Sequence, residues 1–180
     1  MTASTGPDPE SALAADSEPE PESVARAIVL RQLTMAPRSR LQLSRKLAER
    51  NVPKDVAEAV LDRFEEVQLI DDAEFARMWV RSRSQSKKLA KGALRRELAD
   101  KGIVLEAAEE ALSQLSDQDE ESAARDLVQR KLRPGMNLSD RAERDKYTRR
   151  LASMLARKGY APSLAFRIVG EVLAEAGTLE

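Results

Sequence analysis

The sequence predicts an all-α protein in which three three-helix repeats form an elongated, solenoid-like tandem array. Three observations predict this fold: a repeated apolar pattern, helical spacing within each copy, and a turn-forming residue at the same place in every copy. Residues 24–69 recur after a shift of 51 positions, and a diverged third copy follows after a further shift of 57. Such units bury their apolar faces on themselves and on neighbouring units. The aligned apolar residues are Leu43, Leu47, Val52, Val56, Val60, Leu61 and Phe64, then Leu94, Leu98, Ile103, Ala107, Ala111, Leu112 and Leu115, then Leu151, Leu155, Tyr160, Leu164, Ile168, Val169 and Val172.

The chain begins with a segment that offers nothing to bury. Residues 1–22 are rich in Pro, Ser, Ala and acidic residues, and we expect a disordered acidic tail. The first repeat, 23–70, then starts with a helical stripe that ends near Ala36. Ser39 is a good N-cap for the second helix, Asn51 tolerates the left-handed conformation at its end, and Pro53 opens the third helix.

The second repeat spans 71–116 and begins at a well-marked helix start. Asp71 can cap the helix while Glu74 reaches back in a capping box, and the same capping role accounts for Asp72. Phe75 and Trp79 are four residues apart, so we expect both to point into the core. Leu98 is expected in the core, and Gly102 at the helix end where the first repeat has Asn51.

The third repeat spans 117–177. Its first helix is expected at the carboxylates of Asp117 to Glu121, which suit the positive end of a helix dipole. An insertion near 133–140, introduced by Arg133-Pro134-Gly135, is interpreted as a loop and accounts for the longer spacing. Gly159 takes the structural place of Gly102.

Composition excludes most enzyme classes. The chain of 180 residues has no cysteine and no histidine, so it lacks thiolate metal ligands, disulfides and the commonest general base. Asp117, Asp119 and Glu121 have the alternate spacing of a calcium loop, but Ser122 stands where glycine is needed. We expect no catalytic residue, metal or cofactor. No apolar run is long enough for a membrane span and no secretory signal is visible, so we expect a cytoplasmic protein that does not contact membranes, as a monomer.

Charges are sorted along the chain rather than mixed. Residues 1–22 carry six acidic groups and no basic one, which leaves residues 23–180 at +5. Residues 77–101 hold nine Lys or Arg and two acids, whereas residues 105–121 hold seven acids and no base. We expect separate basic and acidic patches on the array.

Two basic stretches are the candidate DNA-binding or filament-binding surface. The alternative for each is a solvated helix face, although such a face usually alternates the signs of its charges. Lys and Arg would contact phosphates without reading bases, so the expected DNA binding depends on salt and has little sequence preference. Trp79 could instead stack on a base of single-stranded DNA, but its alignment favours a core position. The candidate residues are Arg77, Arg81, Arg83, Lys87, Lys88, Lys91, Arg95 and Arg96 in the first stretch, and Arg130, Lys131, Arg144, Arg149 and Arg150 in the second. The second stretch also contains Arg125, Arg133, Arg141 and Lys146.

Several short motifs carry a resemblance to a known family. They are Leu69-Ile70-Asp71-Asp72 with Phe75-Ala76, then Glu97-Leu98, Lys101-Gly102-Ile103 and Arg157-Lys158-Gly159-Tyr160. Over roughly residues 24–175 the chain resembles the bacterial RecX family. It departs from the family at Asn51, where a glycine is usual, and in its acidic tail.

The resemblance implies a non-enzymatic regulator of the RecA recombinase. Members of the family are helical-repeat proteins that lie in the groove of the RecA–DNA filament and suppress its activities, and they have affinity for single- and double-stranded DNA. Two other functions fit the sequence: a sequence-independent architectural DNA-binding protein, and a helical-repeat adaptor for an acidic protein.

Overall fold

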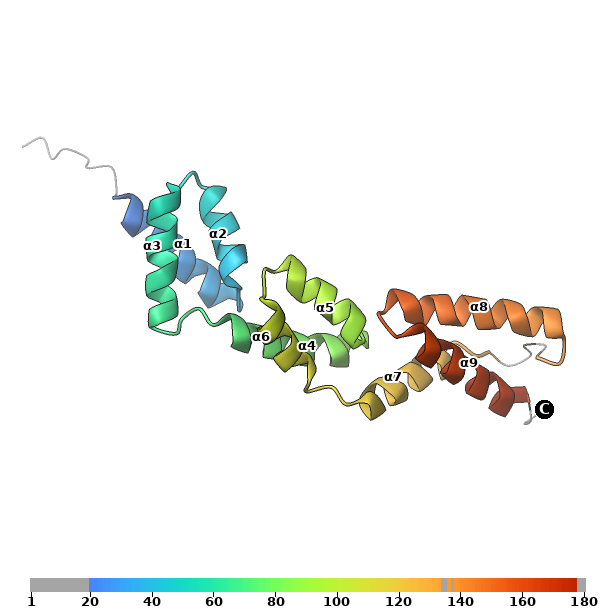
Figure 1. The fold of residues 1–180 in the computed structure, drawn as a ribbon. Helices are drawn as coiled ribbons and strands as arrows, with labels where there is room; N and C mark the ends of the chain where they lie inside the picture. Colours follow the sequence, from blue (N-terminus) through green and yellow to red (C-terminus); the bar gives the residue numbers. More distant parts are fainter. Residues whose placement is uncertain (1–19, 134–135, 137, 178–180) are drawn as a thin grey trace, which may run out of the picture.

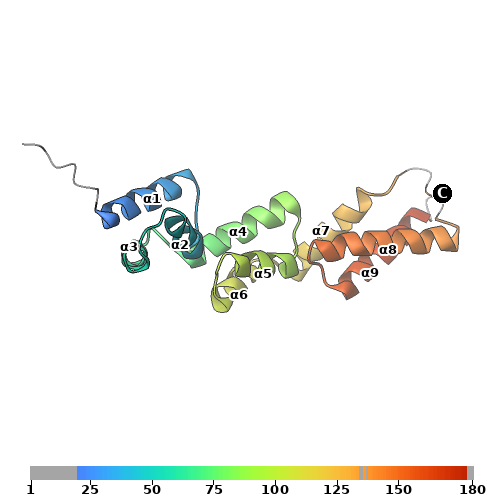
Figure 2. The same ribbon diagram turned by 90° about the horizontal axis from the view of Figure 1, so that it is seen from above.

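The computed structural model describes residues 20–133, 136 and 138–177, and every regular element in that part of the chain is an α-helix. Three groups of three helices follow one another along an elongated molecule, with the chain running from one end to the other (Figure 1). The view from above shows the same succession (Figure 2). The predicted all-α array of three-helix repeats is confirmed. Of the predicted acidic tail, residues 1–19 lie outside the described residues.

The first helical group consists of α1 (Pro21–Met35), α2 (Arg40–Ala48) and α3 (Lys54–Glu66). Proline is favoured at a first helical position because its missing N–H needs no partner there, which explains why α1 begins at Pro21, two residues before the expected start. Ser39 caps α2 as predicted, in a capping box with Gln42. The core of this group is formed by Ala25, Val29, Leu43, Leu47, Ala57, Val60, Leu61, Phe64 and Ile70.

The second helical group consists of α4 (Asp72–Lys87), α5 (Lys91–Asp100) and α6 (Leu105–Leu112). The Asp71 carboxylate accepts the Glu74 N–H at 2.8 Å, so the predicted cap is present. The Glu74 side chain, however, binds the Arg77 guanidinium instead of completing a capping box, because an ion pair one turn along competes for the carboxylate. The core contains Phe75, Ala76, Val80, Leu94, Leu98, Ile103, Ala108, Ala111 and Leu112.

The third helical group consists of α7 (Asp117–Gln129), α8 (Arg141–Arg157) and α9 (Pro162–Gly177). Ser116 and Asp119 form a capping box at the start of α7. The predicted insertion near 133–140 includes residues 134, 135 and 137, which lie outside the described residues. The buried residues of α8 and α9 include Leu151, Leu155, Ile168, Val169 and Leu173.

The same hydrogen-bonded joint connects the groups twice. At the first junction, the Ser39 hydroxyl donates to the Lys101 carbonyl at 2.7 Å and the Arg40 N–H donates to the Asp72 carboxylate at 2.8 Å. At the second, the Ala90 N–H donates to the Lys158 carbonyl at 2.9 Å and the Lys91 N–H donates to the Glu120 carboxylate at 2.7 Å. In both cases the start of a middle helix is satisfied by the following group, which fixes how successive groups are joined.

Glycine is needed at these joints for a reason beyond the helix end. Asn51, Gly102 and Gly159 all have positive φ, at 56°, 77° and 90°. A Cβ atom on Gly102 would lie 2.7 Å from the Leu41 Cβ, and one on Gly159 would lie 2.6 Å from the Ala93 Cβ. Asn51 is exposed in the first group, and no other described group packs against its turn, so a side chain is tolerated there.

Candidate nucleic-acid and filament interface

The first basic stretch lies on α4 and α5, and four of its eight candidate residues are neutralised by carboxylates. Arg77 binds Glu74 at 2.9 Å and Glu110 at 3.4 Å. Arg83 lies 3.8 Å from Glu97. Lys91 binds Asp117 at 2.9 Å, and the Arg95 Nη2 donates to Glu109 at 2.9 Å.

The expected separation into basic and acidic patches is therefore wrong for this part of the molecule. Glu109, Glu110 and Asp117 belong to the acidic segment 105–121, and each of them pairs with a cation of the basic segment 77–101. Because α6 packs against α4 and α5, charges that are sorted in the sequence meet in space. These pairs raise the pKa of Arg77 and of Arg95 and lower the pKa of Glu109 and of Asp117.

The other four residues of this stretch are Arg81, Lys87, Lys88 and Arg96, and none of them has an ion pair among the described residues. Arg81 and Lys88 line a concavity of about 460 Å³ between α4 and α7. Its other wall carries Asp119, Glu120 and Asp126. The carboxylates weaken the attraction of Arg81 and Lys88 for a polyanion but do not pair with either cation.

Trp79 packs against the core with its ring and makes a polar contact through its ring nitrogen. The half-buried ring packs against the core of the second group and lies 5.7 Å from the Phe75 ring. Its Nε1 donates to Glu97 at 2.7 Å, and the Arg83 guanidinium and the Lys101 ammonium lie 4.2 and 4.0 Å from its centre. Burial lowers the pKa of Lys101, although Glu97 opposes this effect. The ring thus already contacts two cations of this chain, which favours the structural role over base stacking.

Cations of the second basic stretch line a concavity whose described residues include no acidic side chain. Arg130, Lys131 and Arg150 line a hollow of about 480 Å³ between the end of α7, the segment after it and α8. Arg133 and Arg157 complete the set, and no described lining residue is acidic. None of the five cations has an ion pair within the described part of the chain. We call these five cations the α7–α8 basic cluster.

Arg144 and Arg149 were expected in the same surface, but they do not line this concavity. Both lie exposed on α8. They belong to the same helix as Arg150 but extend the positive surface outside the hollow.

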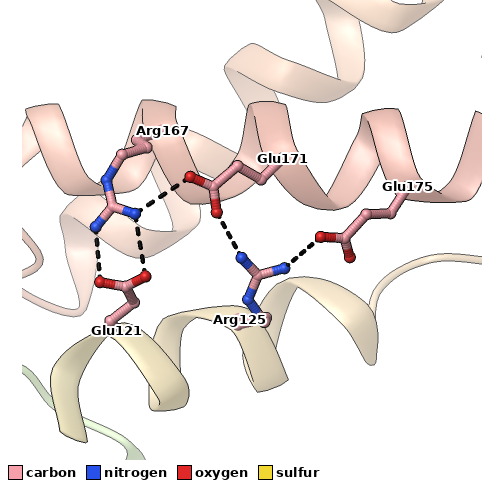
Figure 3. A network of polar contacts seen from close by, with 5 residues as sticks. All are labelled: Glu121, Arg125, Arg167, Glu171 and Glu175. Carbon is pink, nitrogen blue, oxygen red and sulfur yellow. Dashed lines mark hydrogen bonds and ion pairs between the residues drawn. The ribbon is translucent and has the colours of Figure 1, made fainter. Parts of the chain in front are cut away.

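Where α7 faces α9, its charged side chains are paired with side chains of opposite charge. Figure 3 shows an ion-pair network between α7 and α9, in which Arg125 binds Glu171 and Glu175, and Arg167 binds Glu121 and Glu171. The carboxylates raise the pKa of Arg167 above its ordinary value, and Arg167 lowers the pKa of Glu121. Arg125 of α7 is therefore paired with carboxylates of α9, whereas Arg130, Lys131 and Arg133 after it line the hollow beside α8.

Among the residues that line the hollow, Tyr147 and Arg157 belong to neither basic stretch derived from the sequence. The helical spacing of the sequence could have identified them, because residues 147, 150, 151, 154 and 157 share one helix face. This pattern was overlooked because the acidic residues Glu143 and Asp145 lower the net positive charge of the segment. Arg133 is close to Arg130 in sequence and shares its concavity.

Other kinds of site are not supported by the described residues. In that portion of the molecule, no group of three or more His, Cys, Asp or Glu side chains could hold a metal ion. The helices that the structure describes include none long and apolar enough to cross a membrane.

Comparison with known proteins gives a consistent result. Residues 25–64 match the model of the first three-helix domain of RecX, and residues 71–112 match that of the second. Regulatory protein RecX of Streptomyces coelicolor is 51% identical over 158 residues, covering 88% of this chain and 82% of the relative. Regulatory protein RecX of Mycobacterium avium is 44% identical over 160 residues, covering 88% and 91%.

Solved structures share the fold. The crystal structure of RecX from Lactobacillus salivarius superposes with a TM-score of 0.71 at 20% identity, covering 84% of this chain and 96% of that one. A second crystal structure, of a regulatory protein RecX, also gives 0.71 at 24% identity, covering 84% and 72%.

Proposed function

The chain belongs to the RecX family of regulatory proteins, and from this premise we propose that it binds the RecA recombinase filament on DNA and inhibits or modulates its activities. These activities are ATP hydrolysis, strand exchange and the signalling that triggers the SOS response. The observation that carries the proposal is the extended array whose third group holds the α7–α8 basic cluster, five neighbouring cations that have no ion pair with a described residue. An elongated repeat protein can span several filament subunits at once.

Contact with the nucleic acid is assigned to cations that have no ion pair with any residue the structure describes. They are Arg81, Lys87, Lys88 and Arg96 in the second group, and Arg130, Lys131, Arg144, Arg149 and Arg150 in the third. Arg77, Arg83, Lys91 and Arg95 are available to a partner only if the partner displaces their carboxylates, which costs part of the binding energy.

The protein acts in this proposal by occupation and not by catalysis. Binding across neighbouring subunits shifts the filament toward the conformation that the array fits better, and the size of this effect is limited by the difference in affinity between the two conformations. Such a regulator works in the cytoplasm as a monomer and needs no cofactor.

A binding experiment tests the proposal against its two rivals. RecA filaments on single-stranded DNA, held by a slowly hydrolysed ATP analogue, are sedimented with increasing amounts of the protein, and bare DNA and RecA without DNA serve as controls. The proposal predicts saturable co-sedimentation with the filament, at higher affinity than with bare DNA. Equal binding to bare DNA would identify a plain architectural DNA-binding protein, and binding to neither DNA nor filament would favour an adaptor for another protein.

A further inference from the structure

We propose that the hollow between α7 and α8 is a site for single-stranded DNA, in which the α7–α8 basic cluster contacts backbone phosphates and one base stacks on Tyr147. This inference deepens the proposed function, on which it rests for its setting, because it names the form of nucleic acid that the third group contacts. Three features of the hollow support this site, namely its charge, its apolar and aromatic residues, and its size.

The charge of the hollow points to a polyanion. Five cations line it, and none of the described lining residues is acidic. The concavity between α4 and α7 is a useful contrast, because Arg81 and Lys88 there face Asp119, Glu120 and Asp126. Cations that converge without counter-charges repel one another, and a phosphate backbone relieves that repulsion.

The floor of the hollow points to a base. Tyr147, Met154 and Met136 line the hollow and are half-buried, and Leu151, which also lines it, is buried. A site for phosphates alone has no use for an aromatic ring and an apolar floor next to the cations. Basic grooves with an aromatic platform are the usual design of proteins that bind single strands with little sequence preference.

The size and shape favour a single strand over a duplex. The volume of about 480 Å³ lies in the range of pockets that hold small molecules. A nucleotide of a single strand can turn its base into such a hollow, whereas the bases of a duplex are stacked and paired in its interior. Insertion of a duplex base would require unstacking, which costs a few kcal/mol.

The first test uses charge variants and contains no recombinase, so its failure is distinct from failure of the regulatory proposal. A labelled oligothymidylate of about 12 nucleotides is titrated by fluorescence anisotropy. We expect the triple variant Arg130→Ala, Arg150→Ala, Arg157→Ala to bind at least about tenfold more weakly, with a salt dependence reduced by about two units of slope. The matched control is Arg31→Ala, Arg50→Ala, Lys54→Ala, which removes the same charge from exposed positions of the first group. An equal loss in both triple variants would overturn the site.

The second test concerns the base. Tyr147→Leu keeps most of the apolar volume but removes the ring, and it should weaken binding of the oligothymidylate by between about fivefold and a hundredfold, while Tyr147→Phe binds as the wild type does. Binding of a duplex of equal length should not change in Tyr147→Leu. A loss that is the same for duplex and single strand, or no loss for either, would contradict base stacking. Displacement of the oligonucleotide by ATP at a concentration equal to that of its nucleotides would show that the hollow is a mononucleotide site instead.

Discussion

The backbone of Gly159 lies directly against Ala93, so that a Cβ atom at position 159 would be 2.6 Å from the Ala93 Cβ. Gly92 approaches the same place from the other side, because a Cβ on Gly92 would lie 2.6 Å from the Gly159 carbonyl oxygen. The start of α5 and the end of α8 are thus in backbone contact. This contact joins the second and third groups and sets the position of the α7–α8 basic cluster relative to the rest of the array.

The first prediction separates the packing role of Gly159 from its backbone conformation. Asn51 shows that asparagine is accepted at the equivalent position with positive φ, so Gly159→Asn tests mainly the steric contact with Ala93. We expect this variant to lower the free energy of unfolding by about 1–3 kcal/mol. Asn51→Gly, at an exposed position of the first group, should change it by less than about 1 kcal/mol. Equal effects in urea denaturation would show that the contact does not matter.

The second prediction concerns the first junction. Ser39 caps α2 and also donates to the Lys101 carbonyl, and it is fully buried. Ser39→Ala removes the cap and leaves the carbonyl of the half-buried Lys101 without its donor, so we expect a loss of about 2–4 kcal/mol. Ser116→Ala, which removes a capping box at an exposed position, should cost only about 1 kcal/mol. Thermal unfolding followed by circular dichroism measures both, and a similar loss for the two serines would argue against the role of the junction.

Much of the fold could be predicted from the sequence because it depends on local patterns. The apolar repetition located all three cores, and Ser39, Asp71 and the acids after Ser116 marked helix starts through side-chain chemistry that acts over a few residues. The contacts between the three helical groups could not be predicted in this way. The hydrogen bond from Ser39 to Lys101 joins residues 62 positions apart, and no periodicity in the sequence encodes such a pairing.

The candidate site was only partly predictable for the same reason. The sequence shows how many cations a segment has but not which carboxylates fold back onto it. Arg77 and Arg95 looked free in the linear sequence, yet they meet Glu110 and Glu109 through the packing of α6. Arg157, by contrast, was overlooked in the sequence. It lies seven positions after Arg150, and both residues line one hollow.

The third prediction is a loss of stability at high pH that depends on Tyr160. The ring is buried, its hydroxyl donates to the Lys88 carbonyl at 3.0 Å, and burial raises its pKa from 10.0 to about 12. Below pH 10 the phenol is protonated in both states, so its contribution is constant. Between pH 10 and 12 the unfolded chain ionises first, which stabilises the unfolded state and lowers the free energy of unfolding by up to about 3 kcal/mol.

Urea denaturation at about pH 9 and about pH 11.5 measures this effect. Tyr160→Phe keeps the ring but cannot ionise, so its stability should fall less than that of the wild type over the same interval. If the two proteins lose the same stability, Tyr160 is not the group responsible.

The fourth prediction uses the contrast between unpaired and paired cations on α4 and α5. The triple variant Arg81→Ala, Lys87→Ala, Arg96→Ala removes three cations that have no ion pair among the described residues. It should weaken binding to bare DNA severalfold and change thermal stability little, because exposed charges contribute little to folding. Arg77→Ala, Lys91→Ala, Arg95→Ala removes three paired cations and should affect DNA binding less at the same loss of charge. A larger binding defect in the second variant would show that a partner displaces these ion pairs.

The most direct test of the central claim, that this array regulates a recombinase by occupying its filament, is the rate of ATP hydrolysis by RecA on single-stranded DNA as the protein is added. The account predicts that the rate changes until the filament is saturated. It also predicts that the Arg130→Ala, Arg150→Ala, Arg157→Ala variant requires a higher concentration for the same effect. A rate that stays constant while the wild-type protein is in excess would contradict the claim.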